Sequence, residues 1–372
     1  MSAESIHEAE HFVGLMSGTS LDGVDAVLAE IGPGSQIRLL HTHYLPYPDD
    51  LRVQLLALHT PQSDEIHLAA IAANKLARLY AEAIKTLLDG FAPARVRAIG
   101  CHGQTLRHRP ADGYTLQIGN ASLLAELTRI TVVADFRSRD IAAGGQGAPL
   151  VPAFHVRALR DPGAHRVIAN IGGIANITDL PANGPVRGWD TGPGNMLPDA
   201  WIKRHRGAHY DRDGAWAASG TLHPGLLTAL MRHTYLHLPP PKSAGREQFN
   251  LDWLDALLGG LNETIAPTDV QATLLEFTAI SLANAISREC RGAQALYVCG
   301  GGAHNNALMQ RIRTHLPGVR VATTAALGID PDWMEALAFA WLARQTLHHV
   351  PGNLPAVTGA RGERILGAIY PA

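Results

Sequence analysis

The chain has 372 residues, of which 46 % are hydrophobic and 17 % are charged, and its formal net charge is -2. This composition is typical of a globular protein with a sizeable core, and it excludes a disordered chain. The balanced charge argues against a general nucleic-acid binder, and no stretch approaches the roughly 18 apolar residues that a membrane helix needs. At roughly 150 residues per domain, the length predicts two domains.

The N-terminus and the cysteines indicate the compartment. Residues 1–11 carry three glutamates and no apolar segment, so we expect no signal peptide. The three cysteines, Cys101, Cys290 and Cys299, are odd in number and lack the spacing of a metal site. Their simplest interpretation is a reduced state, which predicts a cytoplasmic protein.

The first half of the chain has the pattern of an α/β domain. Short apolar runs bounded by turn residues predict strands, and apolar residues at three- and four-residue steps predict helices. We expect a strand at 12–16, a polar turn at 17–23, a strand at 24–31, a helix at 63–89, a strand at 96–101, a helix at 121–129 and a strand at 130–134.

The second half repeats this alternation after a glycine-rich segment at 141–149. We place the domain junction in that segment, so the expected domains are 1–145 and 146–372. In the second domain we expect strands at 167–171 and 175–180, a turn at 189–195 that opens a helix at 196–204, an amphipathic helix at 270–290, a strand at 295–299, and helices at 305–315 and 330–347, with Pro331 just inside the last one.

Both halves begin with a strand, a small polar or glycine turn and a second strand. Both then continue with alternating helices and strands, which predicts α/β domains with mixed sheets and suggests a duplication. No repeat of roughly 20–50 residues is visible, which argues against solenoids and propellers.

A first candidate site is the turn at 17–25, which reads S-G-T-S-L-D-G-V-D. Successive backbone N–H groups in such a turn can form a nest for an anion, and Gly18 and Gly23 would let a phosphate come close. The side chains that add hydroxyl donors or carboxylates for a hydrated Mg²⁺ are Thr19, Ser20, Asp22 and Asp25. The alternative is a tight hairpin whose polar residues only satisfy turn geometry.

A second candidate is the segment G-G-G-A-H-N-N at 300–306, between an apolar strand and a helix. Three successive glycines leave room for a flat or charged ligand, and a helix N-terminus favours negative charge. The alternative is a strand-to-helix turn in which glycine serves packing. The chain has no G-x-x-x-x-G-K-[ST] loop, which disfavours a P-loop NTPase.

Two single residues are further candidates. Asp190 precedes a Gly-Pro-Gly turn at an expected helix start, so it is either an N-cap or a general base. His102 directly follows an apolar strand, where ligands bind in open α/β sheets, so it is a candidate substrate contact. No His or Cys spacing in the chain matches a metal site.

Taken together, several motifs resemble those of the anhydro-N-acetylmuramic acid kinase family, in the expected order from residue 12 to about residue 344. They are F-V-G-L-M-S-G-T-S-L-D-G-V-D, G-C-H-G-Q-T, A-D-F-R-S-R-D-I-A-A-G-G-Q-G-A-P-L, N-I-G-G-I-A-N-I-T, W-D-T-G-P-G-N, K-S-A-G-R-E-Q-F-N, V-C-G-G-G-A-H-N-N and P-D-W-M-E-A-L-A-F-A-W-L-A. The first and fifth motifs are specific together, whereas a triple glycine alone is not. One position departs from the usual K-S-T-G-R-E, because Ala244 replaces the threonine.

The resemblance implies a fold and a set of site residues. The fold is that of the sugar kinase, Hsp70 and actin superfamily: α/β, with two ribonuclease-H-like domains whose mixed β-sheets are flanked by helices around a central nucleotide cleft. Asp190 would be the catalytic base, and His102 and Glu335 would contact the substrate. The residues implied in ATP binding are Gly18, Thr19, Ser20, Leu21, Asp22, Gly23, Val24 and Asp25 for the phosphates, and Gly300, Gly301, Gly302 and Asn305 for the adenosine.

The activity implied is that of a cytoplasmic enzyme of bacterial cell-wall recycling. It would use ATP, Mg²⁺ and water to open the 1,6-anhydro ring of anhydro-N-acetylmuramic acid and phosphorylate O6, giving N-acetylmuramate 6-phosphate and ADP. O6 carries no proton to remove, so Asp190 would activate a water, as in an inverting glycosidase. The expected partners are the sugar and ATP, with no nucleic acid or membrane, and a homodimer is one of the states left open.

Three alternative functions lead to different expectations. A hexose kinase of the same superfamily would also need an aspartate base but would not require the anhydro ring. An ATPase of the Hsp70 or actin type is disfavoured because we expect no peptide-binding domain after residue 372. A binding module would bind ATP without turnover, and no helix-turn-helix segment favours it.

Overall fold

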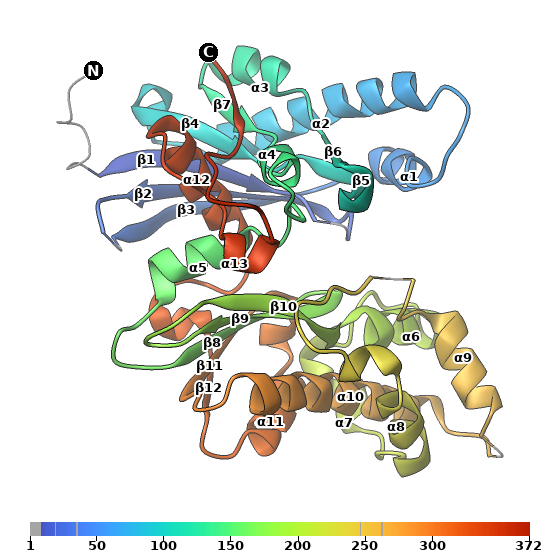
Figure 1. Ribbon diagram of the computed structural model, residues 1–372. Coiled ribbons are helices and arrows are strands. Elements are labelled where there is room, and N and C mark those ends of the chain that lie inside the picture. The colour runs from blue at the N-terminus through green and yellow to red at the C-terminus, as the bar shows by residue number, and fades with distance from the viewer. Residues whose placement is uncertain (1–8, 19, 35, 246, 262) are drawn as a thin grey trace. The chain divides into compact units, whose positions relative to one another are not determined.

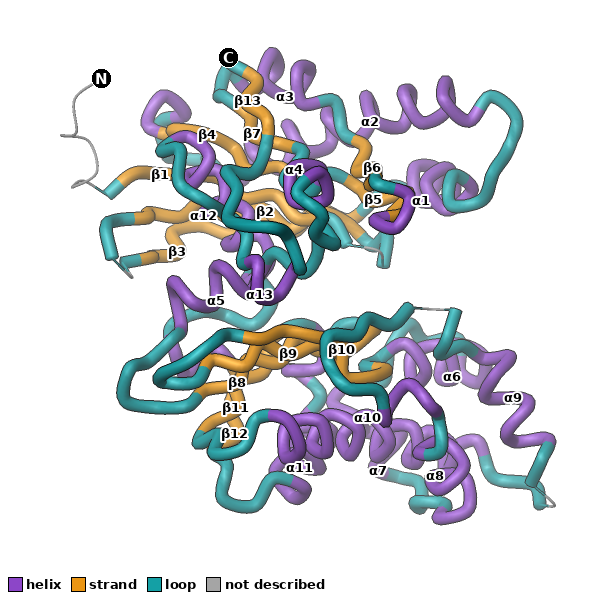
Figure 2. The backbone as a smooth tube through the Cα atoms, viewed as in Figure 1, coloured by secondary structure: helices purple, strands orange, loops and turns teal. Residues whose placement is uncertain are grey.

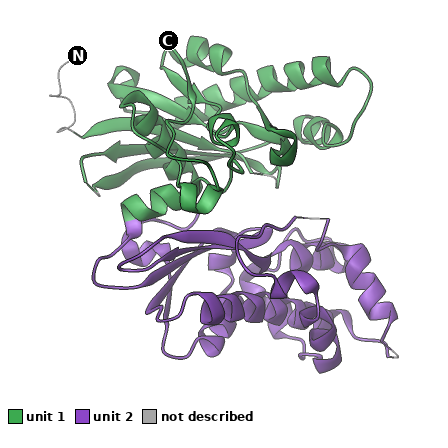
Figure 3. Cartoon of the chain, viewed as in Figure 1, with its two compact units in different colours: residues 1–158, 333–372 green, residues 159–332 purple. Residues whose placement is uncertain are grey.

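The computed structural model describes residues 9–18, 20–34, 36–245, 247–261 and 263–372. Thr19, one of the expected phosphate contacts, lies outside the described residues. The chain forms two compact units (Figure 3): unit 1 comprises residues 1–158 and 333–372, and unit 2 comprises residues 159–332. These units divide the chain differently from the expected domains, because the last 40 residues return to unit 1.

Unit 1 is built on a mixed six-stranded sheet (Figure 1). β1, β2 and β3 form an antiparallel meander, β4 and β7 continue the sheet parallel to β1, and β13 pairs antiparallel with β7. The order across the sheet is β13 (Ala368–Tyr370), β7 (Val132–Ala134), β4 (Val96–Cys101), β1 (Glu10–Met16), β2 (Gly23–Ile31) and β3 (Ile37–Pro46).

Helices cover both faces of this sheet (Figure 1). α2 (Glu65–Leu87) and α3 (Ala121–Thr128) pack on the face that carries Val13 and Leu15. On the other face, the backbone of α12 (Met334–Leu347) lies close to β1 and β4. A Cβ at Gly14 or Gly100 would clash with a carbonyl oxygen of α12, so these two strand glycines let the helix settle on the sheet.

The remaining elements of unit 1 surround this core. They are α1 (Asp49–Ala57), the hairpin β5 (Gln104–Arg109) and β6 (Tyr114–Ile118), α4 (Ser138–Ala142), α5 (Val151–Leu159, whose last residue already belongs to unit 2) and α13 (Pro355–Thr358).

Unit 2 has a five-stranded mixed sheet with the same topology. Its first three strands form an antiparallel meander, and the last two run parallel to the first. The order is β10 (Arg187–Pro193), β9 (Ile174–Leu180), β8 (Arg166–Ile171), β11 (Ala295–Cys299) and β12 (Arg320–Thr323). In both sheets the strands thus follow the order third, second, first, fourth, fifth, which confirms the predicted duplication of ribonuclease-H-like domains with mixed sheets flanked by helices.

The helices of unit 2 gather around α10, which lies centrally among them (Figure 2). α10 (Pro267–Glu289) and α11 (Asn306–His315) pack on one face of the sheet. The other side of α10 packs against a second core formed with α6 (Met196–Arg206), α8 (Pro224–Met231) and α9 (Leu251–Gly259), while the short α7 (Ala215–Ala218) lies against both α10 and α11. α10 is therefore buried on most sides, and it covers the segment in which we expected an amphipathic helix.

Two predicted element boundaries are wrong. Residues 189–193 are not a turn but the end of strand β10, because they pair with β9 across an irregularity between Asp190 and Gly192. The last long helix begins at Met334 rather than at residue 330, so Pro331 lies outside it. The carbonyl of Pro331 instead accepts a hydrogen bond from the backbone N–H of Gly300. No helix among the described residues meets the length and hydropathy needed to span a bilayer.

Candidate functional site

The turn between β1 and β2 is anchored by hydrogen bonds at its base. Ser17 Oγ lies 2.7 Å from the Tyr80 hydroxyl and donates to the Gly103 carbonyl at 3.1 Å. Gln104 Nε2 donates to the Gly18 carbonyl at 3.0 Å. Beyond this base, Ser20 and Asp22 are exposed, and the Ser20 hydroxyl donates to Asp22 Oδ1 at 2.6 Å.

Gly18 and Gly23, the two glycines of this turn, differ in the space that a side chain would have at each position. A Cβ at Gly18 would meet nothing nearer than Ser20 Oγ at 3.6 Å, so the space beside Gly18 is free for a ligand. A Cβ at Gly23 would approach the Leu45 carbonyl to 2.5 Å, so β3 alone explains that glycine. The side chains of Leu21 and Val24 are buried in the hydrophobic core, so neither side chain can contact a phosphate, and the Leu21 N–H already donates to the Gly18 carbonyl at 3.4 Å.

The triple glycine of unit 2 also divides into fold and ligand positions. Gly300 has φ +75, and a Cβ there would clash with the Asn170 side chain. A Cβ at Gly302 would come within 2.5 Å of Ile171. Only Gly301 is exposed, with Asn195 Nδ2 as the nearest atom to a Cβ at 3.7 Å. The packing alternative therefore explains two of the three glycines, and the ligand interpretation depends on Gly301.

Asn305, the other expected adenosine contact, caps helix α11. Its Oδ1 accepts a hydrogen bond from the Leu308 backbone N–H at 2.9 Å. The cap fixes the start of the helix directly after the glycine segment, because it satisfies a backbone donor that has no partner within the helix.

Asp190 is not a helix cap, so this alternative is wrong. The residue before α6 is Asn195, and Asp190 lies on strand β10. Its Oδ2 accepts a hydrogen bond from the Ala244 backbone N–H at 2.9 Å. Since the backbone makes this contact, the missing threonine hydroxyl at position 244 does not remove it.

The segment around Lys242 encloses Asp190. The Tyr235 hydroxyl donates to the Asp190 carbonyl at 2.8 Å, and the Asp190 N–H donates to the Lys242 carbonyl at 3.2 Å. The Lys242 ammonium turns back and donates to the Tyr235 carbonyl at 2.9 Å. Burial lowers the pKa of Lys242 to about 8, helped by the charge of Arg288.

Burial raises the pKa of Asp190 to about 6, although the Ala244 N–H and the Lys242 charge oppose this shift. A carboxylate with a pKa just below neutrality is mostly ionised at pH 7 and is also a better proton acceptor than an ordinary aspartate. Asp190 therefore has the protonation behaviour of a general base.

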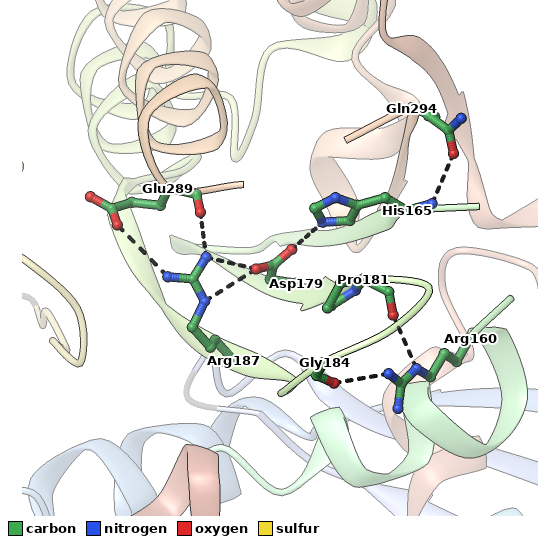
Figure 4. A network of polar contacts seen from close by, with 8 residues as sticks. All are labelled: Arg160, His165, Asp179, Pro181, Gly184, Arg187, Glu289 and Gln294. Carbon is green, nitrogen blue, oxygen red and sulfur yellow. Dashed lines mark hydrogen bonds and ion pairs between the residues drawn. The ribbon is translucent and has the colours of Figure 1, made fainter. Parts of the chain in front are cut away.

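An ionic network around the buried Asp179 fixes the end of the β9–β10 hairpin that lies next to its connecting loop (Figure 4). Asp179 accepts hydrogen bonds from Arg187, at 2.8 Å, and from His165, at 2.6 Å. Arg187 also donates to the carbonyl of Glu289, at the end of α10. This network is conformational support, since it holds the strand that carries Asp190 against the sheet and α10.

In unit 1, His102 is buried and both of its ring nitrogens have protein partners. Nδ1 lies 3.3 Å from the Ser17 carbonyl, and Nε2 accepts from Arg137 at 2.9 and 3.1 Å. The ring packs against Phe339, with centroids 4.7 Å apart. Burial lowers the pKa of His102 to about 3, and the Arg137 charge acts in the same direction.

Glu335 lies in the first turn of α12, in the same unit as His102. Burial raises the pKa of the Glu335 carboxyl, and Arg137 opposes this shift. Unit 1 thus joins His102, Arg137 and the base of the β1–β2 turn by hydrogen bonds, with Glu335 in electrostatic reach of Arg137. In unit 2, Asp190 is bonded to the segment that contains Lys242 and Ala244, whereas the glycine segment packs against Asn170 and Ile171.

The sequence did not single out Arg137, Tyr235 or Lys242. The motif A-D-F-R-S-R-D contains both Arg137 and the exposed Arg139, and nothing in the sequence separates the two. Among the described residues, no group of three or more His, Cys, Asp or Glu side chains could hold a metal ion.

Fold and site together define the class of the protein: a duplicated ribonuclease-H-like α/β protein with a glycine-rich turn in each unit and a half-buried carboxylate, Asp190, in the second. The sequence profile of anhydro-N-acetylmuramic acid kinase matches residues 10–372. The chain belongs to the anhydro-N-acetylmuramic acid kinase family.

Curated relatives of that name agree along the whole chain. The protein from Thiobacillus denitrificans is 75 % identical over 372 residues, which are 100 % of both chains. The protein from Nitrosospira multiformis is 56 % identical and covers 98 % of this chain and 100 % of its own. The protein from Pseudomonas putida is also 56 % identical and covers 97 % of this chain and 99 % of its own.

Proposed function

We propose that this chain opens the 1,6-anhydro ring of anhydro-N-acetylmuramic acid with water and phosphorylates O6 with ATP, as the name of its family indicates. The products are N-acetylmuramate 6-phosphate and ADP, a step of cell-wall recycling. The observation that carries this proposal is Asp190, a half-buried carboxylate that the Ala244 N–H orients and whose pKa burial raises to about 6.

In the proposed reaction Asp190 removes a proton from water, and the water oxygen bonds to the anomeric carbon. The C1–O6 bond breaks, and O6 takes its electron pair and attacks the γ-phosphorus of ATP. ADP leaves, and the proton on Asp190 passes to solvent. Positioning and charge neutralisation account for most of the catalysis of phosphoryl transfer, so one base can serve this sequence.

The residue roles that we propose for the nucleotide follow from the space beside Gly18 and Gly301. The backbone from Gly18 to Asp25 would bind the phosphates, with Gly18 as the point of closest approach. Gly301 would lie against the adenosine, while Gly300, Gly302 and Asn305 shape that segment.

Mg²⁺ would neutralise phosphate charge when bound. The exposed Asp22 and the half-buried Asp25 are hard oxygen ligands of the kind that hold a hydrated Mg²⁺. Since the phosphoryl donor is ATP, we also propose a cytoplasmic site of action. A measurement of the molecular mass in solution tests whether the chain forms a homodimer.

The decisive experiment uses ATP, Mg²⁺ and the anhydro sugar in ¹⁸O water, with mass analysis of the product. We expect one ¹⁸O at C1 and none in the phosphate. Unlabelled N-acetylmuramate 6-phosphate in the same water, without enzyme, controls for exchange at the anomeric carbon. Phosphorylation of a sugar that lacks the anhydro ring, with no reaction of the anhydro sugar, would instead show an ordinary hexose kinase.

A further inference from the structure

Arg137 is a partly buried cation whose protein partners are all neutral. Its Nε and Nη2 donate to His102 Nε2 at 3.1 and 2.9 Å, and its Nη1 donates to the Gly147 carbonyl at 2.8 Å. A guanidinium has five N–H donors, so two remain after these three contacts. Within the described part of the chain, Arg137 forms no ion pair with a carboxylate.

The partners of Arg137 are themselves fixed. Gly147 N–H donates to Asp140 Oδ2 at 2.8 Å, and the fully buried Asp140 also accepts from Asn353 and Thr358. On the other side, His102 lies between Arg137 and the Ser17 carbonyl. The guanidinium is therefore held from two directions, which gives its two free N–H groups a defined orientation.

The hydrogen bonds also determine the state of His102. The Ser17 carbonyl can only accept, so Nδ1 carries the proton, and Nε2 must be unprotonated because it accepts from Arg137. His102 is thus a neutral imidazole with no nitrogen left for a substrate. It accepts charge-assisted hydrogen bonds and leaves the positive charge of Arg137 uncompensated.

A desolvated cation without a counter-ion is costly unless an anion completes the site. Glu335, whose charge acts on Arg137, forms no ion pair with it, and the burial of Glu335 disfavours its own charge. The substrate in the proposed function carries a carboxylate on the lactyl ether of its muramic acid unit. Arginine is the side chain best suited to hold a carboxylate by two N–H groups.

We propose that Arg137 binds the carboxylate of the sugar substrate, and that His102 is a positioning residue that acts through Arg137 instead of touching the substrate. This inference rests on the proposed function. It assigns substrate specificity to Arg137, where the enzyme distinguishes acid-bearing anhydro sugars from neutral ones.

The test compares two ligands, anhydro-N-acetylmuramic acid and its neutral carboxamide, by calorimetric titration. We expect the wild-type protein to bind the acid roughly 10- to 100-fold more tightly than the amide, the value of a charge-assisted hydrogen-bond pair. Arg137→Met should weaken binding of the acid to the level of the amide and leave the amide almost unchanged, and Arg137→Lys should keep part of the preference. The matched control is Arg139→Met, which removes an exposed arginine two residues away and should keep the full preference.

Three results would overturn the assignment of Arg137. Equal loss of acid and amide binding, with a lower Tm, would make Arg137 purely structural. Weaker binding of ATP with unchanged sugar preference would make it a phosphate contact. An unchanged preference in Arg137→Met, in an enzyme that still converts the acid, would refute this inference alone, whereas a wild-type protein that binds neither sugar would refute the proposed function.

His102 has its own test. His102→Leu should reduce the preference for the acid in the same direction as Arg137→Met, whereas His102→Gln, which offers an acceptor to Arg137, should restore part of it. The ¹⁵N resonances of His102 should show the neutral Nδ1–H tautomer throughout pH 5–8. A charged imidazole at pH 6, or an acid preference that survives His102→Leu, would contradict the positioning role.

Discussion

The turns that close the first hairpin of each unit share one topological position and differ in construction. In unit 2, the Gly172 and Gly173 carbonyls accept hydrogen bonds from the backbone N–H groups of residues 194–196, at the start of α6. In unit 1, the side chains of His102 and Gln104 anchor the base of the longer β1–β2 turn and the Tyr47 N–H holds the Asp22 carbonyl, while the side chains of Ser20 and Asp22 are exposed. The same fold thus uses one turn to seat a helix and leaves the other available to a ligand.

The third strands of the two sheets show a similar difference. Strand β3 has no fully buried residue, and half of its positions are exposed. Strand β10 is largely buried, carries Asp190, and is enclosed by the segment that contains Tyr235 and Lys242. Desolvation of the Asp190 carboxylate, which raises its pKa, is therefore a property of the surroundings of unit 2 and not of the strand order.

The largest expected effect concerns Asp190, the desolvated carboxylate on the third strand of unit 2. Asp190→Asn keeps an oxygen for the Ala244 N–H but loses the proton acceptor, so kcat should fall about a hundred- to ten-thousand-fold. Tm and sugar binding should change little. The control is Asp199→Asn, because burial raises the pKa of Asp199 to about 7 as well and we give it no catalytic role. A normal kcat in Asp190→Asn would remove the general base.

The second prediction tests the structural turn against the open one. A Cβ at Gly194 would clash with the Gly172 carbonyl, so Gly194→Ala should lower the free energy of unfolding by about 1–3 kcal/mol. Gly18→Ala meets no close atom and should change that free energy by less than about 1 kcal/mol. Chemical denaturation measures both variants, and equal losses would refute the distinction between the turns.

The third prediction concerns ligand binding at the open turn. Gly18→Val places a branched side chain in the free space beside the backbone, so KM for ATP should rise about tenfold if a phosphate contact is lost there. Tm should stay near the wild-type value. Gly301→Ala should act in the same direction at the adenosine segment. A wild-type KM in Gly18→Val would refute the phosphate assignment.

The smallest effect is the acid limb of the pH profile. Asp190 works as a carboxylate, and its raised pKa of about 6 means that it gains a proton as the pH falls through 6. At pH 5.5 kcat should be lower than at pH 7.5 by about fourfold, because only about a quarter of Asp190 is still ionised. Lys242→Met removes a charge that lowers the pKa of Asp190, so the limb should move to higher pH. A flat profile down to pH 5 would contradict the assignment.

Much of the fold was readable from local sequence patterns. The strand at 96–101 and the strand at 295–299 have the predicted bounds, and the helix expected at 63–89 is observed at Glu65–Leu87. These elements have clear periodicity or sharp turn residues at both ends. The β5–β6 hairpin and β12 were not predicted, because their exposed or short segments have little hydrophobic pattern.

Asp190 shows where a local pattern misleads. A Gly-Pro-Gly sequence before a helix is a typical cap and turn signal, yet residues 189–193 pair with β9. The pairing of a strand is decided by its neighbours in the sheet, which the adjacent sequence does not contain. The orienting contact from the Ala244 N–H also comes from a residue 54 positions away.

By itself the sequence determined the family, the duplicated alternation of strands and helices, and the chemical types available to the site. Only the tertiary structure decided what each of these residues contacts. Gly300 and Gly302 are required by Asn170 and Ile171, whereas a Cβ at Gly301 would meet only Asn195 Nδ2 at 3.7 Å, although the sequence presents three identical letters. His102 binds Ser17 and Arg137 with both nitrogens, although its position at a strand end predicted a substrate contact. The physical reason is that torsional preference and hydrophobic periodicity are local, while steric clash, hydrogen-bond partnership and desolvation depend on atoms that only folding brings near.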